Sequence, residues 1–170
     1  MDDANRNSGG TGPVPPFAID SVPWEEWSRG RFGSRLRRLT DRGGGSHVGV
    51  AVEELPPGKQ SCPAHYHFLE EEHIIALDGE ATLRLGEETY PIRAGDYVCF
   101  PAGQKAAHAL INTSDAPFRF IVIGERNRNE VIVYPDSGKL GVRLMDERYR
   151  TDATVDYWDG EADEPGDDRA

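Results

Sequence analysis

The chain has 170 residues, 37% hydrophobic and 29% charged, with a formal net charge of −11. This composition suits one domain of ordinary size with polar ends. No apolar run approaches the roughly 18 residues that a membrane helix needs, and the N-terminus lacks the basic-then-apolar order of a signal peptide. We therefore expect a cytoplasmic protein. Its two cysteines, Cys62 and Cys99, are too few for a disulfide framework, and we interpret both as free thiols.

The negative charge gathers at the C-terminus. Residues 145–170 hold ten acidic and three basic residues, whereas residues 24–144 hold seventeen and fifteen. We expect a disordered N-terminal segment at 1–23, a folded domain at 24–144 and an acidic, disordered tail at 145–170. Such a tail repels nucleic acid and anionic membranes, so neither is an expected partner.

In chain order, residues 24–27 could open a short helical turn, with Ser21 as its cap. Short apolar or alternating runs follow, separated by turn sequences, which is typical of an antiparallel all-β fold. Asp78-Gly79 and Gly86-Glu87 are spaced for tight hairpins. A closed barrel or two-sheet jelly roll with a central cavity is expected. The predicted strands are 36–39, 48–55, 65–67, 72–77, 81–85, 89–92, 97–100, 108–112, 118–123 and 131–134.

Two histidines flank a tyrosine at His65-Tyr66-His67. On a strand, side chains at i and i+2 point to the same face, so both imidazoles would enter the same space. Glu72 opens the next predicted strand, and His108 begins a later one. His73 would face the other way from Glu72, toward packing or solvent.

Two motifs in this region resemble those of the cupin superfamily, of the conserved-barrel type. The usual first motif has five residues between its first glycine and its first histidine, and this chain has six between Gly58 and His65. The usual second motif has two residues between the glycine of Pro-x-Gly and the histidine, and this chain has four between Gly103 and His108. Both insertions fall in loops. The first motif is matched by Gly58, His65, His67, Glu72 and Gly79, and the second by Gly95, Pro101, Gly103, His108 and Asn112.

The resemblance implies an antiparallel double-stranded β-helix, the jelly-roll barrel, with one divalent metal ion. By position, the implied ligands are His65, His67, Glu72 and His108. Imidazole and carboxylate donors suit iron, manganese, nickel, cobalt or zinc, and about two coordination positions would stay open, as in catalytic sites. Glu70 and Glu71 flank Glu72, so the carboxylate ligand could differ by one position, although the six-residue step to Gly79 favours Glu72. Asn112 is expected to hydrogen-bond across the barrel.

The leading hypothesis is a metalloenzyme that acts on a small oxygenated metabolite, either sugar-phosphate isomerase-like or dioxygenase-like. The alternative is a small-molecule-binding module without turnover. Only Glu70 or Glu71 offers itself as a general base, and Lys139 could reach an anionic substrate. The arginines from Arg29 to Arg42 fit an edge strand that pairs with the acidic tail better than a ligand site. We expect a small-molecule partner and a homodimer.

Overall fold

A computed structural model describes residues 12–161, so the disorder predicted for 1–11 and 162–170 lies outside the described residues. The fold is all-β with antiparallel pairing throughout its named strands, as predicted. The elements in chain order are η1 (Ile19–Ser21), β1 (Glu25–Arg29), β2 (Phe32–Arg38), α1 (Leu39–Gly43), β3 (Val48–Leu55), β4 (Tyr66–His67), β5 (Glu72–Asp78), β6 (Glu80–Leu85), β7 (Glu88–Arg93), β8 (Tyr97–Phe100), β9 (His108–Ile111), β10 (Phe118–Glu125), β11 (Val131–Tyr134), η2 (Pro135–Ser137), β12 (Lys139–Val142), η3 (Arg143–Met145) and β13 (Glu147–Arg150).

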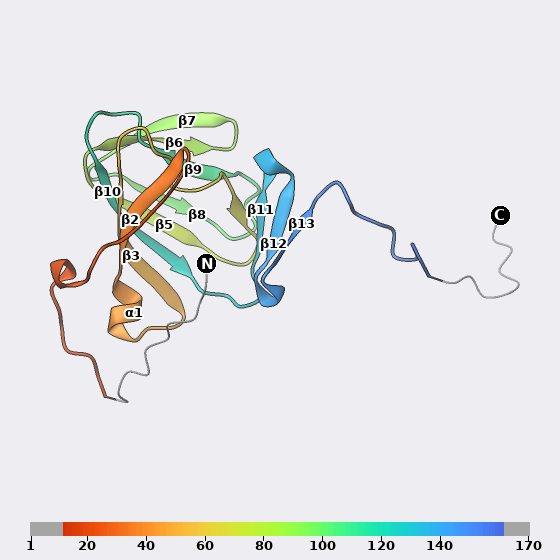
Figure 1. Cartoon of the computed structure of the whole chain (residues 1–170), viewed down its shortest axis with the longest axis horizontal. Coiled ribbons are helices and arrows are strands. Elements are labelled where there is room, and N and C mark those ends of the chain that lie inside the picture. The colour runs from red at the N-terminus through yellow and green to blue at the C-terminus, as the bar shows by residue number, and fades with distance from the viewer. Residues whose placement is uncertain (1–11, 162–170) are drawn as a thin grey trace, which may run out of the picture.

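Three sheets form the jelly-roll barrel and its side wall (Figure 1). The largest has the order β1-β2-β3-β10-β5-β8, and the smaller β7-β6-β9 packs against its inner face. A third sheet, β13-β12-β11-β4, stands at one side of the barrel. Alternate residues of the strands fill the space between the first two sheets. The buried residues of this hydrophobic core are Leu55, Ile74, Ala76, Ala81, Leu83, Ile92, Phe100, Leu110, Phe118 and Phe120.

One of the two predicted hairpins is correct. Gly86-Glu87 joins β6 to β7, with Leu85 opposite Glu88. Asp78-Gly79 instead carries the chain from the six-stranded sheet to the three-stranded sheet, so the hairpin predicted there is wrong. Gly79 has φ +76°, and a Cβ at this position would lie 2.5 Å from the Pro117 carbonyl oxygen. The close approach to a neighbouring loop explains why a glycine stands at the crossing.

The N-terminal part of the domain also differs from prediction. Residues 24–27 do not form a helical turn, because β1 pairs with β2, and a 3-10 turn lies earlier in the chain, at η1. Trp24 packs against the guanidinium groups of Arg35 and Arg37, at 4.7 and 4.4 Å from its ring. Strand pairing and this packing outweigh the local helix signal. The short helix α1 was not expected.

The arginines of β2 find acidic partners within the domain. The cluster was expected on an edge strand, but β2 lies between β1 and β3 and the edge is β1. Within residues 12–161, the acidic partners of the β2 arginines lie outside the expected tail. The pairs in the described part of the chain are Arg35 with Glu54, Arg37 with Asp20 and Arg38 with Glu25. These contacts support the structural interpretation of the cluster.

Part of the expected tail is folded. β13 pairs with β12 over four residues, from Val142 opposite Glu147 to Lys139 opposite Arg150. The turn between them is η3, which is followed by Asp146 with φ 52°. The disorder expected from residue 145 is therefore wrong for 147–150, where backbone pairing with β12 outweighs the high charge of the segment. The outer domain limits stay a prediction.

Candidate metal centre

The four residues implied as ligands converge inside the barrel. One donor atom from each of His65, His67, Glu72 and His108 lies within 4.8 Å of the other three. Backbone pairing sets this arrangement, because His65 and His108 exchange two hydrogen bonds of 3.2 and 2.8 Å. Glu72 begins β5, and His67 ends β4. The structure thus brings these four side chains together, and their role as metal ligands stays a prediction.

The two histidines of the first motif direct lone pairs at the same point. The Nδ1 atom of His65 lies 3.0 Å from the Pro63 carbonyl oxygen, which can only accept a hydrogen bond. Its Nε2 atom is then the unprotonated one. This Nε2 lies 3.1 Å from the Nε2 of His67, whose Nδ1 faces the carboxylates of Glu70 and Glu130 at 3.6 and 3.5 Å. Two lone pairs at this separation repel each other unless a proton or cation lies between them.

His108 has unsatisfied nitrogens in a buried position. It is 3% exposed, and the Phe100 ring stacks on it at a centroid distance of 3.7 Å. Neither ring nitrogen has a hydrogen-bond partner among the described residues, although Nε2 lies 3.5 Å from the Glu72 carboxylate. Leaving a buried polar atom unpaired costs about 1–3 kcal/mol. A cation at the point of convergence would satisfy Nε2, so the donor set fits a metal ion.

The electrostatics of the cluster favour the forms that bind metal. Burial lowers the pKa of His65, and lowers that of His67 to about 4, so both rings are neutral at neutral pH. Burial acts to raise the pKa of Glu72, but the neighbouring His108, His65 and His67 outweigh it and the net shift is downward. His65 and His67 therefore present neutral imidazoles and Glu72 presents a carboxylate, the forms that bind a divalent cation.

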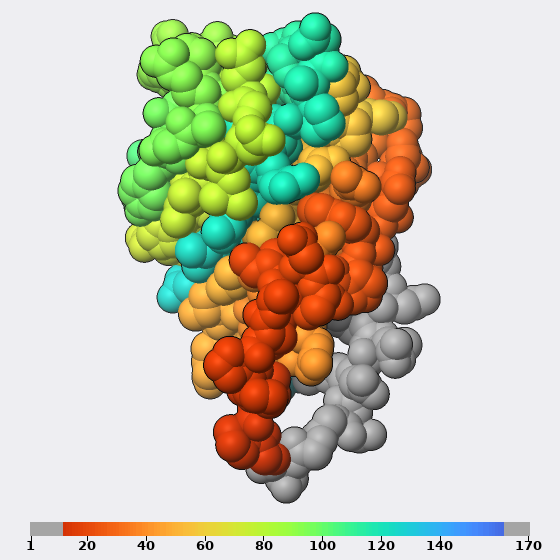
Figure 2. All heavy atoms as spheres, turned by 90° about the vertical axis from the view of Figure 1, so that its left-hand side faces the viewer, coloured from red at the N-terminus to blue at the C-terminus, as the bar shows by residue number. Residues whose placement is uncertain are grey.

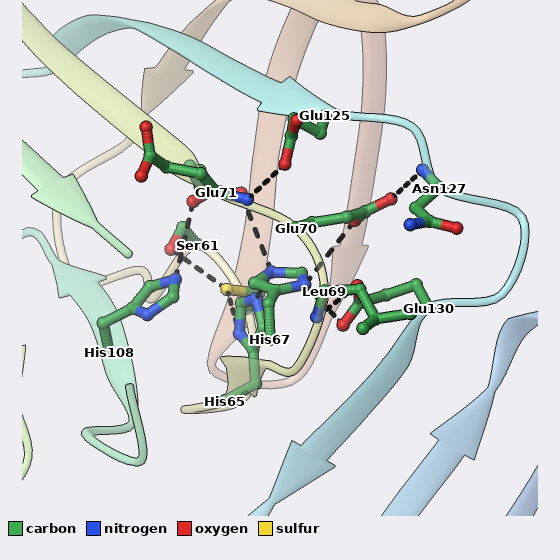
Figure 3. A network of polar contacts seen from close by, with 12 residues as sticks. Ser61, His65, His67, Leu69, Glu70, Glu71, His108, Glu125, Asn127 and Glu130 are labelled. Atoms are coloured by element: carbon green, nitrogen blue, oxygen red, sulfur yellow. Dashed lines mark hydrogen bonds and ion pairs between the residues drawn. The ribbon is translucent and has the colours of Figure 1, made fainter. Parts of the chain in front are cut away.

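A buried carboxylate network supports His67, as Figure 3 shows. Glu130 is fully buried and accepts hydrogen bonds from the backbone N–H groups of Phe68 and Leu69, at 2.8 and 3.0 Å. Glu70 accepts hydrogen bonds from both terminal nitrogens of Arg143 and from the backbone N–H of Asn127. These contacts orient the ring that bears the donor nitrogen, as carboxylates do beside metal-bound histidines.

The flanking glutamates are both engaged elsewhere. Glu70 faces Arg143 and the Nδ1 side of His67, and Glu71 pairs with His73 at 3.1 Å on the outer face of β5. Neither belongs to the group of four donors that converge, so the geometry favours Glu72 as the carboxylate. It also leaves Glu70 and Glu71 poorly placed as general bases.

Sequence reasoning missed a second carboxyl group on the inner face. Glu53 alternates with Ala51 and Leu55 on β3 and lies opposite Phe120 of β10, and both Leu55 and Phe120 belong to the core. Burial, with a smaller contribution from the negative charge of Glu72, raises the pKa of Glu53 from 4.5 to about 7. The alternation along residues 48–55 could have shown that this glutamate points inward.

The third sheet brings an aromatic and basic wall to the centre. β11 pairs with β4, and the Tyr134 ring lies 5.8 Å from the His65 ring. The amino group of Lys139 lies 4.9 Å from the centre of the Tyr134 ring. The Arg148 side chain passes over Gly141, where a Cβ would be 3.1 Å from its Cδ and 3.9 Å from Tyr134. Two basic side chains thus lie beside Tyr134, the residue that borders His65.

Cys62 is close to the centre but unsuited to ligation. Its Sγ lies 3.6 Å from the Nδ1 of His65, the nitrogen that faces away from the point of convergence. Burial raises the pKa of the thiol to about 12, so it is protonated at neutral pH. A structural role for Cys62 agrees with these contacts.

Comparison with known proteins decides the family. A family model described as the cupin domain matches residues 51–124. A solved sugar phosphate isomerase of the cupin superfamily from Silicibacter pomeroyi is 30% identical, over 85% of this chain and 98% of that one, with a TM-score of 0.74. The chain is a cupin. A search of curated proteins found no match.

Two further structures resemble this cupin. A proposed sugar phosphate isomerase from Acidithiobacillus ferrooxidans is 29% identical, over 81% of this chain and 91% of that one, with a TM-score of 0.76. A predicted oxalate decarboxylase from Thermotoga maritima is 23% identical, over 65% of this chain and 97% of that one, with a TM-score of 0.56. The latter shares the fold. Within residues 12–161, no helix has the length and apolar character to cross a membrane.

Proposed function

We propose that this cupin is a metal-dependent isomerase of a small phosphorylated sugar, with its metal ion held by His65, His67, Glu72 and His108. The observation that carries the proposal is the convergence of three imidazoles and one carboxyl group, whose donor atoms lie within 4.8 Å of one another. The similarity to two cupins described as sugar phosphate isomerases, over 81% and 85% of this chain, supports the substrate class. The alternatives are a dioxygenase-like cupin and a binding module without turnover.

The bound ion would polarise a sugar carbonyl or hydroxyl and so acidify the adjacent C–H bond. Iron, manganese, nickel and zinc all suit three imidazoles and a carboxylate. Burial lowers the pKa of His67 to about 4, so this ring would hold such an ion without competition from protons at neutral pH.

Isomerisation between an aldose and a ketose moves a proton between neighbouring carbons, which requires a group that both accepts and donates it. Glu53 is our candidate for this group. It lies on the inner face of β3, and its pKa of about 7 divides it between the two protonation states near neutral pH. A proton-transferring residue works best under this condition.

The basic wall formed by Lys139 and Arg148 would receive the phosphate end of the substrate. Both side chains lie beside Tyr134, and Tyr134 lies beside His65. A substrate that reaches the metal could therefore extend its anionic end along β12 and β13. The expected homodimer and cytoplasmic location belong to the same proposal.

Metal analysis of protein purified without chelators, combined with an isomerisation assay, tests the proposal. We would compare the wild type with His65→Ala and His108→Ala, and with Cys62→Ser as a matched control beside His65. We expect the wild type and the control to hold about one metal ion more than the two histidine variants. Conversion of five- and six-carbon sugar phosphates, followed by NMR, should show the same order.

Three outcomes would contradict the proposal. Equal metal content in the wild type and both histidine variants would refute the metal centre in the barrel. Bound iron with oxygen consumption and no isomerisation would favour the dioxygenase-like alternative. Sugar phosphate binding without turnover, measured by calorimetry, would identify a binding module.

A further inference from the structure

The outer face of β5 carries a second cluster of metal-binding side chains, directly behind the first. Glu71 and His73 are two residues apart and point to the same side, while Glu72 between them points into the barrel. Cys99 of β8 lies directly opposite His73 in the strand register. One donor atom from each of Glu71, His73 and Cys99 lies within 4.8 Å of the other two.

Neighbouring contacts hold these side chains in place. The Nδ1 atom of His73 is 2.8 Å from the Tyr97 hydroxyl, and the two rings stack at 20°. This leaves the Nε2 of His73 facing Glu71, 3.1 Å from its carboxylate. The main chain of Glu71 exchanges two hydrogen bonds with Glu125, at 2.9 and 3.1 Å. A hydroxyl that fixes one imidazole nitrogen leaves the other directed at a ligand, as beside metal sites.

The cluster is accessible from solvent. Glu71 and His73 line a shallow hollow, whose wall also includes Val48, Ile123 and Glu125. Figure 2 shows this face of the six-stranded sheet, where the red N-terminal segment lies over the orange and gold strands and leaves the yellow-green and teal ones open. The Glu125 carboxylate offers a further oxygen at the rim of the hollow.

We propose that Glu71, His73 and Cys99 form a second divalent-cation site, separate from the barrel centre and suited to zinc. A thiolate, an imidazole and a carboxylate are a donor set that zinc favours, whereas magnesium and calcium prefer oxygen alone. On binding, the Cys99 thiol releases its proton to solvent as the metal–sulfur bond forms. The ion would join β5 to β8 at the end of β5 where Glu72 points inward.

Cobalt titration of the whole chain tests this site, because cobalt reports sulfur ligation by a thiolate charge-transfer band in the near ultraviolet. The four donors of the barrel centre include no sulfur and give no such band. We expect the wild type to show the band, and Cys99→Ser to lose it while keeping the visible cobalt absorption of the barrel centre. Cys62→Ser, which alters the other thiol, should keep the band.

Further measurements separate this site from folding effects and from the proposed function. His73→Gln should weaken the cobalt binding that produces the band by at least about 10-fold, with circular dichroism unchanged. Absence of the band in the wild type would overturn the proposal, as would a band that survives Cys99→Ser and disappears in Cys62→Ser. A band that saturates at one equivalent, without binding by the barrel centre, would support this site and contradict the proposed function.

Discussion

The two faces of β5 at its start offer similar donors in different surroundings. Inside, His67 and His108 are 8% and 3% exposed, and their nitrogens lack full hydrogen bonding in the described structure. Outside, His73 and Glu71 are 28% and 44% exposed and already pair with each other. A cation would satisfy the buried, unpaired nitrogens of the inner cluster, whereas the outer cluster is solvated without one. Strand alternation thus supplies donors to both faces, and burial determines how strongly each needs a metal.

Removal of one histidine from each face should give the largest contrast. His67→Ala removes a buried donor that Glu130 and Glu70 orient, and should weaken binding at the barrel centre by more than about 100-fold. His73→Ala should leave affinity at the barrel centre within a few fold. Competition with a metal indicator would measure both. Equal losses in the two variants would show that the faces are coupled, against this comparison.

Stability as a function of pH should test the inner-face carboxyl group. Burial raises the pKa of Glu53 from 4.5 to about 7. As the pH rises through this interval, the unfolded chain ionises Glu53 first, so folding must either protonate the carboxylate again or bury its charge, and both cost free energy. The native state is therefore penalised above pH 7 and not below pH 4.5. Glu53→Gln should raise the free energy of unfolding at about pH 8, by at most about 3 kcal/mol, with little change at about pH 4.5.

Urea unfolding of the metal-free protein at both pH values would measure this difference. Glu54→Gln is the matched control, because its carboxylate lies on the outer face and pairs with Arg35 and Arg119. The control should lose stability at the higher pH. A stabilisation by Glu53→Gln that is equal at both pH values would show that Glu53 does not titrate as proposed.

The amino-acid pattern was sufficient to predict most of the fold and the converging side chains. Strands β3, β8 and β11 begin and end where the alternation and turn residues predicted. The H-x-H pattern places two imidazoles on one face by strand geometry alone. Asn112 was expected to hydrogen-bond across the barrel, and its amide donates to the carbonyl oxygens of Leu55 and Ala116, both at 2.8 Å.

What could not be predicted depends on contacts between distant segments. Glu130 stands outside both motifs, and only the fold brings it next to His67. It accepts a hydrogen bond from the backbone N–H of Phe68, which is sixty-two residues earlier in the chain. Asp78-Gly79 has the sequence of a hairpin, but the sheet to which β6 belongs is decided by the packing of its apolar face. β13 is highly charged, and its pairing with β12 stabilises a strand that composition argues against.

The supporting network should matter less than the ligands themselves. Glu130→Gln keeps the size of the side chain but loses a carboxylate oxygen that accepts a backbone N–H and faces His67. We expect metal affinity at the barrel centre to fall about 10–100-fold. Glu125→Gln, which alters a more exposed acceptor of one backbone N–H, is the control and should change it little. An equal effect of both variants, measured with the metal indicator, would remove the distinction between them.

The smallest effect should come from the best-formed ion pair on the surface. Asp136 accepts two hydrogen bonds from Arg84, at 2.6 and 2.9 Å, but the pair is solvated, with side chains 40% and 29% exposed. Asp136→Asn should therefore reduce the free energy of unfolding by no more than about 1 kcal/mol, with metal affinity unchanged. Arg143→Met leaves buried Glu70 without its partner and should cost about 3–5 kcal/mol. Urea unfolding would measure the loss of stability in both variants. A larger loss in Arg143→Met would show that burial contributes more than ideal geometry to the strength of an ion pair here. Equal losses would contradict this.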